Sequence, residues 1–160
     1  MNINIVCIGK LKESYWREAV SEYVKRVSPY AALRICELPE SRLPENPSPA
    51  QIESALTEEY KSMLPYVSAR SAYNVALCVE GEQLDSLQLA KGLDRWGTQG
   101  FSTVNFFIGS SFGLSGELKA SARLRLSISR LTLPHQLARV VLCEQIYRAY
   151  TIINNKRYHK

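Results

Sequence analysis

Short β-rich apolar runs alternate along this chain with stretches that have helical periodicity. The first run covers residues 3–8 and ends at Gly9, and an amphipathic stretch over residues 13–27 follows it. Further runs of the same kind lie at residues 33–38, 73–79 and 103–108. Strands that alternate with helices pair in parallel, because each helix crosses over one face of the sheet. The pattern predicts an α/β fold, with a mainly parallel sheet of five or six strands and helices on both faces.

Two capping boxes indicate where helices begin. Ser48 has Gln51 three residues later, with a proline at the first helical position, and Asp85 has Gln88 at the same spacing. The helix that begins at Ser48 is predicted to end near Leu64, and the helix that begins at Asp85 is predicted to end near Gly97. Further along the chain, the pattern predicts a short helix from about Ser115, a strand over Leu124 to Ile128 and a long helix after Pro134.

The length of 160 residues predicts a single domain over residues 1–160, with 46% hydrophobic residues to build its core. The formal net charge of +5 is unevenly spread, since residues 98–160 carry nine basic and two acidic side chains. Such a region favours a polyanionic partner, RNA or DNA, because phosphate contacts provide affinity without base readout. A solvated basic surface is the alternative.

The cysteine pattern and the absence of a leader predict where the protein resides. Four cysteines lie far apart in apolar segments, and we interpret them as reduced thiols of a cytosolic protein. No basic leader with an apolar core precedes the first strand, and no apolar run approaches the roughly 20 residues of a membrane span. We therefore expect a soluble cytoplasmic protein with no membrane partner.

Three loops that follow predicted strands are candidates for one pocket, because ligands of open parallel sheets bind beyond the carboxyl ends of the strands. These loops cover residues 77–81, 109–113 and 129–134. Gly109 and Gly113 would let the second loop approach a ligand closely, although an ordinary tight turn is the alternative. The loop matches neither the P-loop nor the dinucleotide-binding pattern, so neither nucleotide hydrolysis nor hydride transfer is supported.

The two histidines do not indicate a metal site. Neither His135 nor His159 has a histidine, cysteine or carboxylate at ligand spacing, and a structural role is the favoured interpretation of His135. The basic residues around His159 are Lys156, Arg157 and Lys160. These could hold phosphates while Tyr158 and His159 stack on or hydrogen-bond a base, and a loose basic tail is the alternative.

The last predicted helix is apolar on nearly every side. Glu144 and Arg148 are spaced as an ion pair on one face. The apolar positions of this helix are Val140, Val141, Leu142, Ile146, Tyr147, Tyr150, Ile152 and Ile153. A chain this small can hardly cover such a helix alone, so we expect a homodimer, whose interface charges could belong to a site shared between subunits.

Several motifs, in this order, are together highly specific. They are Ile5-Val6-Cys7-Ile8-Gly9-Lys10-Leu11-Lys12 with Tyr15-Trp16 and Glu22-Tyr23, Phe107-Ile108-Gly109 with Gly113-Leu114, Thr132-Leu133-Pro134-His135-Gln136, Arg139-Val140-Val141-Leu142, Glu144-Gln145, Tyr147-Arg148-Ala149 and Tyr158-His159-Lys160. Over essentially its whole length the chain resembles the bacterial large-subunit ribosomal RNA methyltransferase H family, a small branch of the SPOUT class of trefoil-knotted methyltransferases.

The resemblance implies a homodimer that uses S-adenosylmethionine to methylate N3 of a pseudouridine in helix 69 of 23S ribosomal RNA, in the assembled ribosome. It also implies a C-terminal trefoil knot, which periodicity cannot reveal. The cofactor positions of the family fall on Leu77, Gly109, Ile128, Ser129, Arg130, Leu131, Thr132 and Leu133. Ser110 stands where the family usually has a second glycine. If that position needs a positive φ, serine costs about 1 kcal/mol, and its side chain would crowd the cofactor, so we expect an effect on cofactor affinity.

Transfer of a methyl group needs the target nitrogen in line with the methyl carbon and freed of its proton. Because histidine titrates near neutral pH, we expect His159 to take or relay this proton and Tyr158 to pack the target base. The residues expected to bind RNA phosphates are Arg139, Arg148, Arg157 and Lys160. Two alternatives stay open: a non-catalytic RNA-binding module of the ribosome with a vestigial pocket, and a flavodoxin-like flavin or nucleotide binder.

Overall fold

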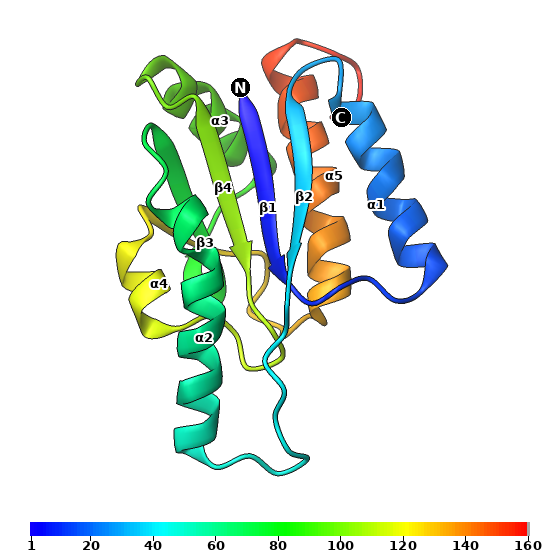
Figure 1. Ribbon diagram of the computed structural model, residues 1–160. Helices are drawn as coiled ribbons and strands as arrows, with labels where there is room; N and C mark the ends of the chain where they lie inside the picture. The colour runs from blue at the N-terminus through cyan, green and yellow to red at the C-terminus, as the bar shows by residue number, and fades with distance from the viewer. Residues whose placement is uncertain (160) are drawn as a thin grey trace.

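The computed structural model describes residues 1–159, and this part of the chain contains five strands in one sheet (Figure 1). The strands are β1 (Asn2–Ile8), β2 (Ala32–Leu38), β3 (Ala72–Gln83), β4 (Thr103–Ile108) and β5 (Leu124–Ser127). Their order across the sheet is β2-β1-β4-β3-β5, and each neighbouring pair is parallel. The predicted parallel α/β fold is confirmed, and the C-terminal knot stays a prediction.

Helices cover both faces of the sheet, as the alternating pattern predicts. They are α1 (Ser14–Val27), α2 (Pro49–Val67), α3 (Ser86–Thr98), α4 (Gly116–Ser121) and α5 (His135–Ile153). Both predicted capping boxes are present, one closed by Ser48 with Gln51 and the other by Asp85 with Gln88. Within the described residues, no helix is both long enough and apolar enough to cross a bilayer.

The end of α2 lies beyond the position that the sequence predicts. The helix continues past Leu64 to Val67 with Pro65 in its last turn, where the proline gives up one backbone hydrogen bond. The carbonyls of Tyr66 and Val67 are instead engaged by side chains of the sheet. Contacts with the sheet therefore hold the last turn that the proline alone would disfavour.

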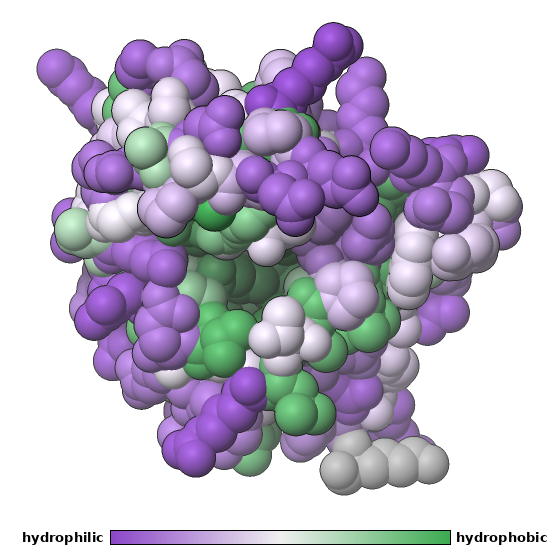
Figure 2. Space-filling model, turned by 90° about the horizontal axis from the view of Figure 1, so that it is seen from below, coloured by the Kyte–Doolittle hydropathy of each residue, from purple (hydrophilic) through white to green (hydrophobic). Residues whose placement is uncertain are grey.

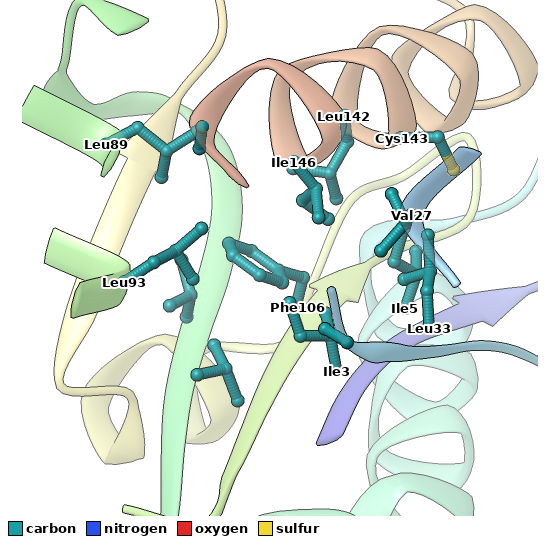
Figure 3. Packing of buried hydrophobic residues seen from close by; sticks show 14 of the residues in the cluster. Ile3, Ile5, Val27, Leu33, Leu89, Leu93, Phe106, Leu142, Cys143 and Ile146 are labelled. Carbon is teal, nitrogen blue, oxygen red and sulfur yellow. The ribbon is translucent and has the colours of Figure 1, made fainter. Parts of the chain in front are cut away.

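Strand alternation sends successive side chains into two separate cores. On one face, Ile3 and Ile5 of β1 and Phe106 of β4 pack against α1, α3 and α5. Figure 3 shows Leu142 and Ile146 of α5 above Phe106, with Leu89 and Leu93 of α3 beside them. On the other face, Val6, Ile8 and Phe107 pack with Met63 of α2 and Leu118 of α4. The sheet is thus a central layer between two helical layers.

A row of asparagines crosses the sheet on the α2 face. Asn4, Asn105 and Asn74 lie at matched register positions on β1, β4 and β3. The Asn4 amide donates to Asn105 Oδ1 at 2.8 Å, and the Asn105 amide donates to Asn74 Oδ1 at 3.1 Å. Asn105 also donates to the Tyr66 carbonyl at 2.9 Å, and Asn74 donates to the Val67 carbonyl at 2.8 Å. The row therefore fixes the strand register and the C-terminal turn of α2 together.

Strand β3 is longer than predicted and is irregular in the middle. Both Leu77 and Glu82 pair with Leu126 of β5, so the residues between them bulge away from the ladder. A Cβ atom on Gly81 would lie 2.7 Å from the backbone of Arg125 and Leu126, so only glycine permits this approach. The bulge places residues 78–80 beyond the carboxyl edge of the sheet.

Helix α5 receives more cover from its own chain than its sequence indicates. It packs between α1 and α3 on the sheet, and Leu142, Cys143, Ile146 and Ala149 are each at most 1% exposed. Val140, Val141, Ile152 and Ile153 remain half-buried. The homodimer therefore stays a prediction. The half-buried residues leave apolar surface that a second protomer could cover.

Removing the central asparagine tests the polar row. Asn105→Ala leaves the Tyr66 carbonyl, the Asn74 side-chain oxygen and the Asn4 amide without their partner, so we expect the free energy of unfolding to fall by about 2–3 kcal/mol. The exposed Asn2→Ala is the matched control and should change it by less than about 0.5 kcal/mol. Urea unfolding measures both, and equal midpoints for the two variants would contradict the proposed role.

Candidate functional site

A cavity of about 700 Å³ opens at the carboxyl ends of the strands. Its wall comes from residues within 77–80, 108–114 and 126–138. Figure 2 shows this end of the molecule, with a hollow whose floor is hydrophobic and whose surroundings are largely hydrophilic. The three loops selected from the sequence therefore meet in one cavity, large enough for a nucleoside-sized ligand.

All but one of the predicted cofactor residues line this cavity. Those in its wall are Leu77, Gly109, Ile128, Ser129, Leu131, Thr132 and Leu133. Arg130 is not part of the wall and is exposed. The structure thus brings together residues from three distant segments, as a common ligand would require.

The loop after β4 is a tight turn that needs glycine at both ends. The Gly113 amide donates to the Ser110 carbonyl at 2.9 Å, and Gly113 has a φ of +84°. A Cβ atom on Gly109 would lie 2.0 Å from the Gly113 carbonyl oxygen, far inside van der Waals contact. The Gly109 backbone therefore faces the other end of the turn directly, and no larger residue fits there.

The positive φ that would strain Ser110 is absent. In residues 1–159, the non-glycine residues with positive φ are Ser71 and Asn155, so Ser110 does not adopt the left-handed conformation that favours glycine. Its hydroxyl instead donates to the Glu59 carboxylate at 2.9 Å. Serine consequently costs no backbone strain here. Ser110 also lines the cavity, so the expected effect of its side chain on cofactor affinity stays a prediction.

The cavity wall combines apolar side chains with a few polar groups. Leu77, Leu114 and Leu126 contribute apolar surface. Near the opening, Lys119 Nζ lies 2.7 Å from Glu80 Oε1, and this bond holds the pKa of the Glu80 carboxyl below its ordinary value. An apolar chamber with a few charges at its edge suits a ligand that has both a flat apolar part and polar groups.

The loop between β5 and α5 is organised by its own hydrogen bonds. Ser127 Oγ donates to the Ser129 carbonyl at 2.9 Å, and the Leu131 amide donates to Ser129 Oγ at 3.0 Å. These bonds give the loop a defined shape along one side of the cavity. Leu131 is nevertheless 75% exposed, which is unusual for a leucine beside an apolar cavity.

Arg139 lies elsewhere than the predicted RNA contact requires. It is fully buried, its Nη1 lies 2.7 Å from Glu37 Oε1, and its Nη2 donates to the Gly9 carbonyl at 3.1 Å. A guanidinium held in this way cannot reach a phosphate outside the protein without breaking both contacts. We therefore omit Arg139 from the RNA-binding surface.

His135 lines the cavity, although its sequence position favoured a structural role. Burial and the nearby Arg139 charge lower the pKa of His135 below its ordinary value, which favours the neutral imidazole. The sequence signal for this position is that His135 directly follows the 129–134 loop, which was predicted to line the pocket. Neutral imidazole can accept or donate a hydrogen bond at the wall of the cavity.

Tyr158 is held against α5. Its hydroxyl donates to Glu144 Oε1 at 3.1 Å, and the Arg148 guanidinium lies 4.7 Å from the centre of its ring. Arg148 and Glu144 form the predicted ion pair at 2.6 Å. Burial and the bond to Glu144 raise the pKa of Tyr158 to about 12. The segment that contains Tyr158 is therefore not a loose tail in this structure.

The predicted catalytic and RNA-binding residues lie away from the cavity of their own chain. Tyr158, His159, Arg148 and Arg157 do not contribute to its wall. Tyr158 bonds to Glu144, nine residues along α5 from the cavity residue His135, which is a rise of about 13 Å. His159 and Arg157 are exposed, and the prediction for Lys160 lies outside the described residues.

The described part of the chain contains no group of three or more histidine, cysteine, aspartate or glutamate residues that could hold a metal ion. Its four cysteines are free. Burial raises the pKa of both Cys7 and Cys143 to about 12, so neither thiol is ionised at neutral pH. The titratable side chains that line the cavity are instead those of Cys78, Glu80, Lys119 and His135.

Comparison with known proteins gives full-length matches. The family model described as "Predicted SPOUT methyltransferase" matches residues 1–159. The chain is 45% identical over 160 residues to proteins named "Ribosomal RNA large subunit methyltransferase H" from Bacillus thuringiensis (strain Al Hakam), Bacillus cereus (strain B4264) and Bacillus anthracis. Each match covers 100% of both chains, so the cavity and the C-terminal segment both lie within the region of similarity.

The close approach at Gly109 gives a stability test. Gly109→Ala forces a methyl group into the Gly113 carbonyl, so we expect the free energy of unfolding to fall by about 3 kcal/mol. Gly116→Ala is the matched control, because a Cβ atom at Gly116 meets open space at the start of α4, and it should be neutral or slightly stabilising. Thermal unfolding followed by circular dichroism compares the two. A Gly109→Ala protein as stable as wild type would exclude this geometry.

Proposed function

The chain belongs to the SPOUT methyltransferase family, and we propose that it transfers a methyl group from S-adenosylmethionine to 23S ribosomal RNA. The target is N3 of a pseudouridine in helix 69, methylated in the assembled ribosome. The full-length similarity to proteins named ribosomal RNA large subunit methyltransferase H carries this proposal. Ribosomes as the substrate place the reaction in the cytoplasm.

The cavity provides features that S-adenosylmethionine requires. Its apolar wall can hold the adenine ring, and Gly109 and Gly113 of the turn form part of that wall without side chains. The 129–133 segment adds backbone and hydroxyl groups for the polar parts of the cofactor. When bound, the cofactor supplies an activated methyl group on its sulfonium. The residues of the chain hold and orient it and exclude water.

Removal of the N3 proton is the step that a side chain must assist. We propose that His159 takes or relays this proton and that Tyr158 packs against the target base. Neither residue lines the cavity of its own chain. We therefore propose a homodimer in which the C-terminal segment of one protomer faces the cavity of its partner.

Exposed apolar residues near the opening of the cavity support the homodimer. Val79, Phe112 and Leu131 all line the cavity, and they are 46%, 43% and 75% exposed. Apolar side chains grouped beside a cavity commonly mark a surface that another molecule covers. A second protomer placed there would bury these residues and deliver its own C-terminal segment.

The proposed RNA surface contains fewer arginines than the sequence predicted. Arg157 is exposed, and Arg148 is partly exposed with its guanidinium over the Tyr158 ring. We propose that both bind phosphates, together with Lys160. Because these contacts are electrostatic, binding to ribosomes should weaken as salt concentration rises.

A non-catalytic RNA-binding module would have the same basic surface as the enzyme, but it would not require an intact cavity. The cavity is well formed, and Ser110 introduces no backbone strain into its wall. These observations favour the enzyme over a module with a vestigial pocket. A flavin or nucleotide binder is the remaining class, and purified protein that is coloured or loaded with nucleotide would support that class instead.

The decisive experiment uses ribosomes that lack the methyl group. Purified protein is incubated with labelled S-adenosylmethionine and these ribosomes, and the modified nucleotide is mapped. We expect label at N3 of a single pseudouridine in helix 69. Label at another nucleotide would refute the proposed target, and no label together with no cofactor binding in calorimetry would support the RNA-binding module.

The proton-transfer role of His159 gives a separate prediction. His159→Ala should lower kcat for methylation by about 10²-fold or more while cofactor affinity remains close to wild type. Lys156→Ala is the matched control for kcat, because this exposed basic side chain of the same segment contributes at most to ribosome binding and is not a general base. Its kcat at saturating ribosomes should therefore stay close to wild type. Methylation of ribosomes and calorimetry with the cofactor measure the two effects. Full activity in His159→Ala would reject the catalytic role.

A further inference from the structure

Glu59 is a buried carboxylate that joins two segments of the chain. It lies on α2 with 5% of its surface exposed. Its Oε2 accepts the Ser110 hydroxyl at 2.9 Å, and its Oε1 accepts the Ser41 amide at 3.1 Å. Ser110 belongs to the turn in the cavity wall, and Ser41 belongs to the proline-rich segment between β2 and α2. One side chain therefore ties both segments to the same helix.

The burial of Glu59 is not explained by an ion pair. Among the ion pairs of residues 1–159, none involves Glu59. Burial raises the pKa of its carboxyl, and the bonds from Ser41 and Ser110 oppose that rise. A buried carboxylate without a cation is costly, and an apolar residue of similar size would serve packing alone better. Glutamate at this position provides the two hydrogen bonds, which an apolar residue could not make.

Each oxygen of the carboxylate accepts one of the two bonds. A glutamine at this position could keep both contacts, because its Oε1 can accept from the Ser41 amide while its Nε2 donates to the Ser110 hydroxyl oxygen. Alanine removes both contacts. Glycine in place of Ser110 would remove the hydroxyl that reaches Glu59.

The bond from Ser41 locates the proline-rich segment. Besides its amide contact with Glu59, Ser41 donates its hydroxyl to the Ala55 carbonyl at 3.3 Å. The segment that leaves β2 is thereby attached to α2 close to Glu59. Movement of this segment and movement of the cavity turn consequently act on the same carboxylate.

We propose that Glu59 is a positioning residue that holds the Ser110–Gly113 turn in the conformation that binds the methyl donor and couples this turn to the segment around Ser41. The proposal rests on the proposed function, in which the cavity takes S-adenosylmethionine. Ser110 transmits the effect, because its hydroxyl is the contact between the cavity wall and Glu59. Glu59 itself is not part of the cavity wall and acts through the turn.

Hydrogen exchange tests the coupling without any ligand. In Glu59→Ala both hydrogen bonds are lost, so we expect the amides of residues 109–113 and of residues 40–42 to exchange roughly tenfold faster than in wild type. Glu58→Ala is the matched control, because the exposed Glu58 on the same helix pairs with Lys61 and, among the described residues, has no hydrogen bond to either segment. If both segments exchange at the same rate in Glu59→Ala as in Glu58→Ala, the proposal is overturned.

Cofactor binding tests the positioning role. Ser110→Ala and Glu59→Ala should each raise the Kd for S-adenosylmethionine roughly tenfold, which corresponds to the loss of one hydrogen bond to a charged group. The double variant should bind no more weakly than Glu59→Ala alone, because both substitutions remove the contact between Ser110 and Glu59. In methylation assays KM for the cofactor should rise while kcat changes little.

The outcomes separate this proposal from the proposed function. Wild-type affinity in both single variants, or additive losses in the double variant, would overturn the positioning role even if the wild-type protein methylates ribosomes. Failure of the wild-type protein to bind S-adenosylmethionine would refute the proposed function. The exchange experiment would then still decide whether Glu59 couples the two segments.

Discussion

The buried guanidinium of Arg139 determines where the long C-terminal helix begins relative to the sheet. It contacts Glu37 of β2 at 2.7 Å and the Gly9 carbonyl at the end of β1 at 3.1 Å, and Glu37 also accepts the Leu11 amide at 3.0 Å. Removing one partner of such a pair typically costs about 3–5 kcal/mol, because a charge is left buried without compensation. The contact holds the first turns of α5 at the carboxyl ends of the strands. The position of the 128–138 wall depends on it.

Two further buried polar contacts position the other side of the cavity. The asparagine row attaches the end of α2 to the sheet, and Glu59 attaches the turn after β4 to the middle of α2. Apolar packing supplies most of the stability of both faces, but it is non-directional. Hydrogen bonds and ion pairs need specific distances and angles, so they fix the relative positions of elements that packing only holds together.

The sequence predicts those parts of the fold that local signals specify. Strand alternation and the two capping boxes act over a few residues. Both capping boxes form at the predicted residues, and each of the five strands overlaps a predicted run. The pairing of Leu77 and Glu82 with one residue of β5 follows from a close backbone approach near residue 126, which no local pattern records. Arg139 and Glu37 are 102 residues apart along the chain, so the sequence does not show that they form an ion pair. An arginine on a helix can equally well be interpreted as an RNA contact. Glu59, the hydrogen-bond partner of Ser110, lies 51 residues away along the chain, so no local pattern indicates why serine suits this position.

The separation between the cavity and the C-terminal segment follows from the direction of α5. The helix starts beside the cavity and runs back along the sheet for 19 residues, a length of about 27 Å, toward the amino ends of the strands (Figure 1). Tyr158 folds back only as far as Glu144, so one chain offers the methyl-donor side of the proposed reaction without the residues proposed to act on the target base. In a two-fold dimer each protomer meets its partner through the same surface, so a contact between one C-terminal segment and the partner's cavity is made twice. Dimerisation would then be a requirement for catalysis as well as a way to cover apolar surface.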